Sequence, residues 1–356
     1  MSIKTYFLQV KEVTQETSDS VTIYFWHPLS EQIKYKAGQF VTIIVPAGEG
    51  GKKVRRSYSM STSPHSDTSI GITVKRVPEG LVSNYLNDNV KVGDFLEVIE
   101  PLGNFFVEPD ADKTRHILLF AAGSGITPMM SIAKSVLKME QNSRVTLIYG
   151  NRSEDSIIFK HKIEELETQY GKRFGVYHLL SRPTDTWVGH KGRISQGMAI
   201  RLMKEADTDF MKDEFYLCGP VQMMEDVIAG LNIYNVPKER IHREVFNAPM
   251  VDGEIEPVVE ADESLQTQTV KIKYNGDEFD IEVKPHQTIL EAALDVDIDL
   301  PYSCQAGMCT ACMGTCTEGK VKMDEEDGLT EKEIKKGIIL TCVAHPLTKG
   351  VVIEID

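Results

Sequence analysis

The chain has 356 residues, 41% of them hydrophobic and 26% charged, and its formal net charge is −14 at pH 7. This length allows two or three domains, and the composition excludes a collagen-like chain, a disulfide-stapled miniprotein and a wholly disordered chain. The negative charge argues against a protein that grips nucleic acid or an anionic membrane.

The charge excess lies entirely in the last third of the chain. Residues 1–246 contain 30 basic and 30 acidic residues, whereas residues 247–356 contain 9 basic and 23 acidic residues. We therefore expect the last third to be a separate unit with partners of its own. The first residues lack the pattern of a secretory signal, and no stretch approaches the ~18 consecutive apolar residues of a membrane span. We accordingly expect a cytoplasmic protein that does not enter a membrane.

Residues 1–108 alternate between apolar and polar side chains and break at turn residues. The alternation predicts short strands at 6–13, 21–26, 39–45, 69–74 and 95–98. Short strands at this spacing predict an antiparallel sandwich or barrel.

Residues 109–246 show a different pattern, in which apolar strands alternate with helices. A continuously apolar strand at 116–122 leads through a glycine-rich turn into a helix at 127–139. The strands and helices predicted after it lie at 144–149, 158–170, 176–180, 197–205, 215–217 and 221–231. This succession is typical of βαβ units, and right-handed crossovers then give an α/β Rossmann-like domain with a buried parallel sheet.

Residues 247–266 contain six carboxylates, no basic residue and two prolines, which predicts an extended, self-repelling acidic linker. Two short strands then flank Asn275-Gly276, a strong signal for a β-hairpin. A helix at 288–296, a group of cysteines and a last strand at 350–355 complete a small α+β unit over residues 267–356.

Five of the six cysteines lie within 39 residues of one another, which indicates a metal or cluster site rather than a disulfide framework. Cys304, Cys309 and Cys312 follow the spacing C-x4-C-x2-C, and Cys342 comes after 29 further residues. This spacing is that of plant-type [2Fe–2S] sites, in which one loop supplies three thiolates and a distant segment supplies the fourth. A structural zinc site is the alternative, but zinc favours two C-x2-C pairs and the chain has one. Cys316 has no place in the spacing and is predicted to be a buried core thiol.

The segment from Asp299 to Cys312 resembles the cluster loop of plant-type ferredoxins. The resemblance covers residues 267–356 and implies a β-grasp fold.

The tetrapeptide Arg56-Ser57-Tyr58-Ser59 lies between two predicted strands. It offers a guanidinium for a phosphate, an aromatic face for a ring and a hydroxyl for a flavin nitrogen, although by itself an exposed arginine would explain it. A strand at 71–76 and the start of a helix at 80–83 follow, where a glycine and a helix N-terminus suit a pyrophosphate. Together these segments resemble the flavin domain of the ferredoxin–NADP reductase superfamily, an antiparallel Greek-key β-barrel that binds FAD.

By that resemblance Arg56 and Ser83 hold the flavin phosphates, Tyr58 stacks on the flavin ring, and Ser59 is a catalytic residue near the reactive nitrogen. The other residues implied in FAD binding are Ser57, Thr73, Val74, Lys75, Gly80, Leu81 and Val82.

A second glycine-rich motif, Gly123-Ser-Gly125-Ile-Thr127-Pro128, follows a buried strand and opens a helix. Its backbone can approach a pyrophosphate closely, and a helix N-terminus favours negative charge. Pro128 occupies the position of the third glycine of the dinucleotide-binding fingerprint. The same reductase superfamily uses this G-x-G-I-T-P form, which implies that Thr127 faces the contact between flavin and nicotinamide.

Cys218-Gly219-Pro220 ends another predicted strand and resembles the motif of the superfamily whose cysteine lies close to the nicotinamide. The resemblance implies a catalytic role for Cys218 and cofactor contacts for its two neighbours, with core packing of Cys218 as the alternative.

Ser181 and Arg182 follow a strand at the carboxyl edge of the predicted sheet, where such sheets bind ligands. With Lys191 and Arg193 nearby they suit a 2′-phosphate, so we expect NADPH rather than NADH. The alternative is a solvated basic loop.

Phe246 closes the domain, and relatives place an aromatic residue near the flavin there. Phe246 is therefore predicted to act at the ring, with core packing as its alternative.

The order of flavin barrel (1–108), NAD(P)-binding domain (109–246) and ferredoxin domain (267–356) resembles the reductase component of bacterial multicomponent oxygenases. The subgroup implied is the phenylacetyl-CoA epoxidase reductase type, with ketosteroid-hydroxylase reductases very near. Such a protein passes electrons from NAD(P)H through FAD and a [2Fe–2S] cluster to a terminal oxygenase. NAD(P)H gives two electrons at once as hydride and a cluster accepts one, so the flavin splits the pair.

The acidic run at 324–327 is predicted either to orient the cluster face toward a basic patch on the oxygenase or to be a solvated loop. Two other functions stay open from the sequence. In one, the flavin domains reduce a small acceptor and the ferredoxin unit is vestigial. In the other, the chain is a non-enzymatic iron–sulfur or zinc protein.

Overall fold

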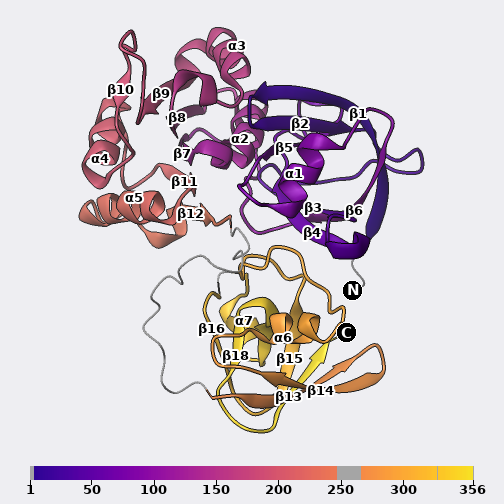
Figure 1. Ribbon diagram of the computed structural model, residues 1–356. Helices are drawn as coiled ribbons and strands as arrows, with labels where there is room; N and C mark the ends of the chain where they lie inside the picture. Colours follow the sequence, from indigo (N-terminus) through magenta and orange to yellow (C-terminus); the bar gives the residue numbers. More distant parts are fainter. Residues whose placement is uncertain (1–3, 247–265, 327, 356) are drawn as a thin grey trace.

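The computed structural model describes residues 4–246, 266–326 and 328–355, which form three units, each built on a β-sheet (Figure 1). The sheets occupy residues 5–102, 116–244 and 268–355. The predicted linker at 247–266 lies outside the described residues except for its last residue.

The first unit is an antiparallel barrel of six strands in the order β4-β3-β6-β1-β2-β5. Its elements are β1 (Thr5–Thr17), β2 (Ser20–Phe25), β3 (Phe40–Val45), β4 (Val54–Ser59), β5 (Ile70–Lys75), α1 (Leu81–Asp88) and β6 (Phe95–Leu102). A bridge between Met60 and Ile72 joins the end of β4 to β5 and closes the barrel. Inward side chains such as Leu8, Ile23 and Ile43 are fully buried against one another, so alternate residues of the strands build one apolar core. The barrel prediction is confirmed.

The strand β4 differs from the expectation, which placed Arg56 to Ser59 between two strands. The segment pairs with β3 along its whole length, from Val54 opposite Val45 to Ser59 opposite Phe40. Its side chains are partly buried at every position but the last. The strand has polar groups on both faces, so it lacks the apolar–polar alternation by which a strand is predicted.

The second unit is a parallel sheet in the order β10-β9-β8-β7-β11-β12. Its strands are β7 (His116–Ala122), β8 (Arg144–Asn151), β9 (Phe174–Leu180), β10 (His190–Lys191), β11 (Glu214–Cys218) and β12 (Ile241–Glu244). Its helices are α2 (Ile126–Met139), α3 (Lys160–Tyr170), α4 (Gln196–Glu205) and α5 (Val221–Ile233). Two apolar clusters, one with α2 and α3 and one with α4 and α5, cover the two faces of β7. The predicted Rossmann-like arrangement is confirmed.

The third unit is a mixed sheet in the order β14-β13-β19-β15-β17, with β16 and β18 forming a separate ribbon. Its elements are β13 (Gln268–Tyr274), β14 (Asp277–Val283), α6 (Ile289–Asp295), β15 (Met313–Glu318), β16 (Val321–Met323), α7 (Glu331–Ile334), β17 (Ile338–Leu340), β18 (Ala344–Pro346) and β19 (Val351–Ile355). Asn275 and Gly276 have φ of 53° and 87°, as a two-residue hairpin turn of the primed type requires. Thr288 and Glu291 form a capping box that begins α6. The α+β prediction is confirmed.

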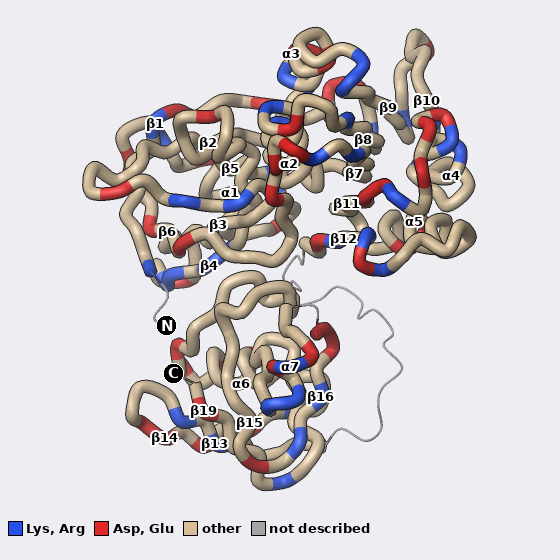
Figure 2. The backbone as a smooth tube through the Cα atoms, turned by 180° about the vertical axis from the view of Figure 1, so that it is seen from behind, with Lys and Arg blue, Asp and Glu red and all other residues tan. Residues whose placement is uncertain are grey.

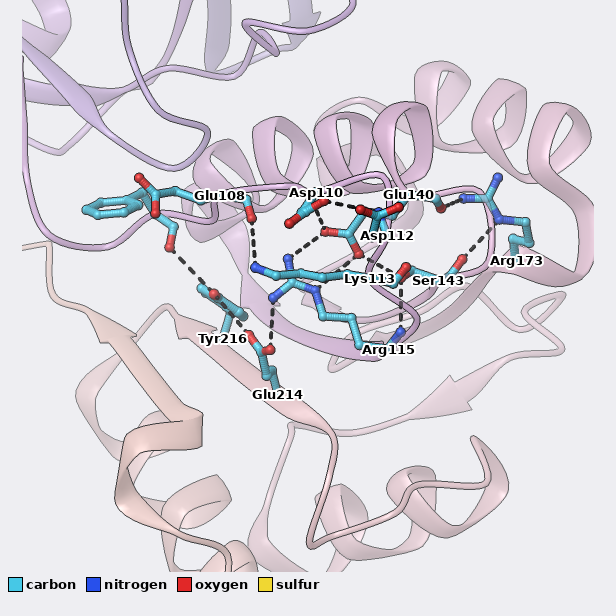
Figure 3. A network of polar contacts seen from close by, with 11 residues as sticks. Glu108, Asp110, Asp112, Lys113, Arg115, Glu140, Ser143, Arg173, Glu214 and Tyr216 are labelled. Carbon is cyan, nitrogen blue, oxygen red and sulfur yellow. Dashed lines mark hydrogen bonds and ion pairs between the residues drawn. The ribbon is translucent and has the colours of Figure 1, made fainter.

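A polar network fixes the segment that connects the barrel to the parallel-sheet unit (Figure 3). The Glu140 carboxylate is fully buried and accepts hydrogen bonds from Arg115 at 2.7 and 3.1 Å and from the Ser143 hydroxyl at 2.6 Å. Arg115 also donates to Glu214 at 2.8 Å. Buried charges are tolerated when they are satisfied from several sides in this way, so the network holds the incoming chain against the start of β11.

We predict that Arg115→Met lowers the free energy of unfolding of the parallel-sheet unit by about 3–5 kcal/mol, because it leaves the Glu140 carboxylate buried without its cation. Scanning calorimetry of the full chain measures the shift of the corresponding transition. The matched control is Arg201→Met, which removes an exposed helical ion pair with Glu205 and is expected to cost under about 0.5 kcal/mol. Equal shifts for the two variants would contradict the structural role of Arg115.

Candidate functional site

The strand β4 presents Arg56 and Tyr58 on one face, whereas Ser57, also predicted to bind FAD, lies on the opposite face, where its hydroxyl contacts that of Thr42 at 2.9 Å. Arg56 and Tyr58 alternate with Arg55 and Ser57, so the two pairs point to opposite faces of the strand. Burial lowers the pKa of the Arg56 guanidinium, and no carboxylate among the described residues forms an ion pair with it. A partly buried cation without an acidic partner suits a phosphate.

Ser59 carries a buried hydroxyl with unused hydrogen-bonding capacity. The residue is 3% exposed, and its Oγ has no hydrogen-bond partner among the described residues. A buried hydroxyl without a partner costs about 1–3 kcal/mol. A bound ring nitrogen or oxygen would remove that cost, although Ser59, the last residue of β4, alternates with Arg56 and Tyr58 and shares the face of Arg55 and Ser57.

The turn before α1 fits a phosphate through its backbone. Helix α1 begins after Gly80 without a side-chain cap, so its first amides have no protein side chain to satisfy them. A Cβ at position 80 would lie 2.6 Å from Ser83 Oγ, which explains the glycine. The Ser83 hydroxyl accepts a bond from the Val77 amide at 3.1 Å, so it also shapes the turn. Leu81 is exposed and Val82 is buried.

The residues predicted at the ring edge use their side chains within the barrel. The Thr73 hydroxyl contacts those of Thr22 and Ser61 at 2.8 and 3.0 Å, and Val74 is in the core. Lys75 pairs with Asp19 at 3.5 Å. Only the backbone of residues 73–75 is thus left to face a ligand.

The two glycine motifs of the parallel-sheet unit meet at the carboxyl ends of β7 and β11. A Cβ at Gly125 would lie 2.0 Å from the carbonyl oxygen of Cys218, so only glycine allows this approach. Gly123 has φ of 54° and open space beside it. The Thr127 hydroxyl donates to the Ser124 carbonyl at 3.0 Å in the first turn of α2, where Pro128 also lies. Gly219 and Pro220 follow Cys218 and lead into α5.

Cys218 is fully buried, and burial raises the pKa of its thiol. Its strand partner on β12 is Glu244, which is 4% exposed. Burial, with a smaller contribution from Cys304, raises the pKa of Glu244 to about 8. Glu244 was not predicted as a site residue, because its place beside Cys218 depends on the pairing of β11 with β12. Phe246 is 42% exposed, which excludes its alternative of core packing.

The segments after β8 and β9 run side by side at the carboxyl edge of the parallel sheet, and the β10 loop joins them through the Gly192 amide, which donates to the Leu180 carbonyl at 2.8 Å. The Ser181 amide donates to the Asn151 carbonyl at 3.0 Å, and the Arg182 amide donates to the Arg152 carbonyl at 2.7 Å. The side chains of Arg152, Arg182, Lys191 and Arg193 are exposed there. Arg152 was missed from the sequence because its position beside Arg182 depends on the pairing of β8 with β9.

The four predicted cluster ligands converge. The Cys304 sulfur lies within hydrogen-bonding reach of Cys309 and Cys342, and Cys342 lies within reach of Cys312. Hydrogen bonds among these closely packed thiols lower the pKa of Cys304 and raise the pKa of Cys309 and of Cys342. The Ala306 amide also donates to Cys304 Sγ at 3.4 Å. These donors fit an iron–sulfur cluster, whose sulfurs accept backbone hydrogen bonds. Among the described residues no group of three or more His, Cys, Asp and Glu is arranged to hold a single metal ion.

Cys316 lies on β15, outside this group, and its thiol contacts the Glu318 carbonyl at 3.3 Å. It is partly exposed rather than fully buried, which corrects its prediction as a buried thiol.

The acidic run at 324–327 is partly engaged in contacts within the chain. Asp324 lies 2.9 Å from His345, and Glu325 pairs with Arg243 at 2.8 Å. Asp327 lies outside the described residues.

Comparison with family models divides the chain in the same way. The oxidoreductase FAD-binding domain matches residues 8–107, the oxidoreductase NAD-binding domain matches residues 119–228, and the 2Fe-2S iron-sulfur cluster binding domain matches residues 272–347. The predictions of FAD, a nicotinamide nucleotide and a [2Fe–2S] cluster are confirmed at the level of these domains.

Similar proteins span the whole chain. The ferredoxin reductase component of 3-ketosteroid-9-alpha-monooxygenase from Rhodococcus rhodochrous is 37% identical over 356 residues, covering 99% of this chain and 97% of that protein. A subunit of 1,2-phenylacetyl-CoA epoxidase from Escherichia coli K12 is 35% identical over 354 residues, covering 98% and 97%. The structure of phthalate dioxygenase reductase shares the fold, with a TM-score of 0.62 at 22% identity over 99% of this chain and 98% of that chain. No helix among the described residues is long and apolar enough to cross a membrane.

We predict that Cys304→Ser, Cys309→Ser, Cys312→Ser and Cys342→Ser each abolish or cripple cluster assembly, because each removes a bond to iron. Iron content and the visible spectrum of the purified protein measure this, and reduction of the flavin by NADPH should survive in each variant. Cys316→Ser is the matched control and should keep the iron content of the wild type. Loss of the cluster in Cys316→Ser with retention in Cys342→Ser would show that the ligand set is wrong.

Proposed function

Since the chain belongs to the family of oxygenase reductases with FAD-, NAD- and [2Fe–2S]-binding domains, we propose that it carries electrons from NADPH to a phenylacetyl-CoA epoxidase-like oxygenase. The observation that carries the proposal is the double use of β4. One face of this strand bears Arg56 and Tyr58, while Ser57 on the other face contacts Ser303, the residue before Cys304. The proposed flavin site and the cluster loop therefore lie on the two opposite faces of the same strand.

When bound, these groups would supply hydride transfer from the nicotinamide, the change from two-electron to one-electron transfer at the flavin, and one-electron transfer at the cluster. The chain's own residues bind and orient these groups. Arg56 and the first turn of α1 hold phosphates, and Tyr58 covers the ring. The Ser59 hydroxyl gives its unused hydrogen bond to the ring edge.

On the nicotinamide side, Gly123 leaves open space beside the backbone for the nucleotide, and Gly125 lets the start of α2 pack directly against the Cys218 carbonyl. Cys218 and Glu244 line the inner side of this site and exclude water from it, since both are almost completely buried. Phe246, at the exposed end of the same segment, covers the ring when no nucleotide is present. The cofactors also support a cytoplasmic location, where NAD(P)H is supplied and clustered thiols stay reduced.

The preference for NADPH rests on the loops at the carboxyl edge of β8 and β9. Arg152 and Arg182 project from adjacent backbone segments, with Ser181 between them and the β10 loop beside them. A set of guanidinium groups with a hydroxyl suits a 2′-phosphate, whereas NADH recognition would use a carboxylate for the ribose hydroxyl.

We predict that Arg182→Ala raises KM for NADPH tenfold or more, with a cost of about 1.5–3 kcal/mol, and changes KM for NADH much less. Steady-state reduction of ferricyanide with each nucleotide measures both constants without involving the oxygenase. Lys212→Ala, an exposed lysine near the start of β11, is the matched control and should leave both constants unchanged. Equal effects of Arg182→Ala on both nucleotides would contradict the proposed phosphate contact.

Reconstitution with a purified oxygenase tests the electron route. The wild-type chain should support product formation with NADPH, while Cys342→Ser should reduce ferricyanide normally and fail with the oxygenase. If the variant without a cluster still supported the oxygenase, the flavin would be the donor and the cluster vestigial. A second candidate partner is a ketosteroid monooxygenase, favoured by the 37% identity to a reductase of that system. Exchange of the two oxygenases in the same assay distinguishes them.

A further inference from the structure

The cluster loop lies against the flavin barrel. Cys304 and Cys309 form a small apolar contact with Phe40 and Leu102 of the barrel, together with Ala311. Cys312 and Cys342 belong instead to the core of the ferredoxin domain. The side of the cluster loop that points out of its own domain is thus the side that the barrel covers.

Three hydroxyl groups extend this contact. Thr42 is fully buried and its hydroxyl contacts that of Ser303. The Ser57 hydroxyl lies 2.9 Å from Thr42 and 3.3 Å from Ser303. These short side chains set the distance between the cluster loop and the barrel strands β3 and β4. They add little apolar contact area.

Ion pairs surround the apolar contact. Lys52 pairs with Asp297 and Arg55 with Asp299, each at 2.9 Å, and Arg243 pairs with Glu325 at 2.8 Å. Each of these cations comes from the barrel or the NAD-binding domain, and each of these carboxylates comes from the ferredoxin domain. We call Asp297, Asp299 and Glu325 the carboxylate rim. Figure 2 shows basic segments of the barrel on the side that faces the ferredoxin domain.

This arrangement suits a reversible contact. The Lys52–Asp297 pair is exposed on both sides, and exposed ion pairs contribute little to stability, whereas Arg55 and Glu325 have side chains that are only 20% and 24% exposed. An open cleft of about 390 Å³ between the two domains is lined by Lys52, Arg55, Asp297, Asp299 and Tyr302, so the contact is incompletely packed. Polar contacts of this kind between domains resemble transient interfaces.

We propose that the carboxylate rim is used twice: it holds the ferredoxin domain on its own barrel, and after release it binds a basic docking face of the protein acceptor. The proposal rests on the proposed function, in which the cluster donates to a protein. A partner that approaches Cys304 and Cys309 must take the place of the barrel, because the other two ligands are enclosed in the domain core. It also meets three carboxylates that are matched to cations in the closed state, so a basic surface fits there best.

The test uses horse cytochrome c, a basic one-electron acceptor, as the probe, and measures two steps separately by stopped flow. The first step is reduction of the cluster by the flavin after mixing with NADPH. The second is the bimolecular oxidation of a previously reduced cluster by cytochrome c at low ionic strength. The rate of Cys342→Ser, which lacks the cluster, is subtracted as the direct contribution of the flavin.

Two sets of variants should change these steps in different ways. The rim variant (Asp297→Asn, Asp299→Asn, Glu325→Gln) should slow both steps about threefold or more. The cation variant (Lys52→Gln, Arg243→Gln) leaves the rim intact, so it should slow the internal step and speed the reaction with cytochrome c. Thr42→Val loosens the contact without changing charge and should act like the cation variant. Added salt should reduce the charge effects.

The matched control neutralises three exposed carboxylates of β14 (Glu278→Gln, Asp280→Asn, Glu282→Gln) and should change neither step appreciably. If the rim variant reacts with cytochrome c like this control, the acceptor uses another face and the proposal is overturned. A cation variant that is slowed with cytochrome c would overturn it as well. If Cys342→Ser reduces cytochrome c as fast as the wild type, the proposed electron route fails instead, so the two failures are distinguishable.

Discussion

The alternation of side chains along β4 is the constraint on which the proposed electron path depends. Successive residues of a strand point to opposite faces, so Arg56 and Tyr58 are available to one neighbour and Arg55 and Ser57 to another. A shift of one residue in the pairing of β4 with β3 would exchange the two sets and disconnect both sites. The register is fixed by six consecutive pairs with β3 and by the Met60–Ile72 bridge that closes the barrel. Barrel closure is thereby a condition for placing the proposed flavin site next to the cluster loop.

The strongly apolar elements could be predicted from the sequence, because they are buried within the cores of their own domains. This holds for β3, β7 and α2, and for the hairpin at Asn275-Gly276, where the turn residues alone determine the geometry. The strand β4 could not be predicted in this way, because polar side chains occupy both of its faces. The cluster ligands could be predicted because their spacing is local, except for Cys342, which the family pattern supplies. Arg152 and Glu244 could not, since their positions depend on the pairing of β8 with β9 and of β11 with β12.

The uneven distribution of charge along the chain can be related to the contact between the domains. The first 246 residues are neutral overall, yet they place Lys52, Arg55 and Arg243 where the acidic ferredoxin domain meets them. The carboxylates of the rim come from two separate segments, at 297–299 and at 325. The acidic run at 324–327 is thus only part of the charged surface, and two of its members already have partners within the chain. Charge density along a sequence identifies an acidic domain, whereas the face that docks depends on how its loops are folded around the cluster.

The strand β12 resembles β4, because consecutive residues on it also face different neighbours. It is the last strand of its sheet. Arg243 points outward to Glu325 of the ferredoxin domain, while Glu244 is buried beside Cys218. The terminal strands of these two sheets therefore place one residue at a proposed cofactor site and the next residue in the contact with the ferredoxin domain. Because each strand is continuous backbone, release of the ferredoxin domain can break the ion pairs and hydroxyl contacts while leaving the residues of the cofactor sites in place.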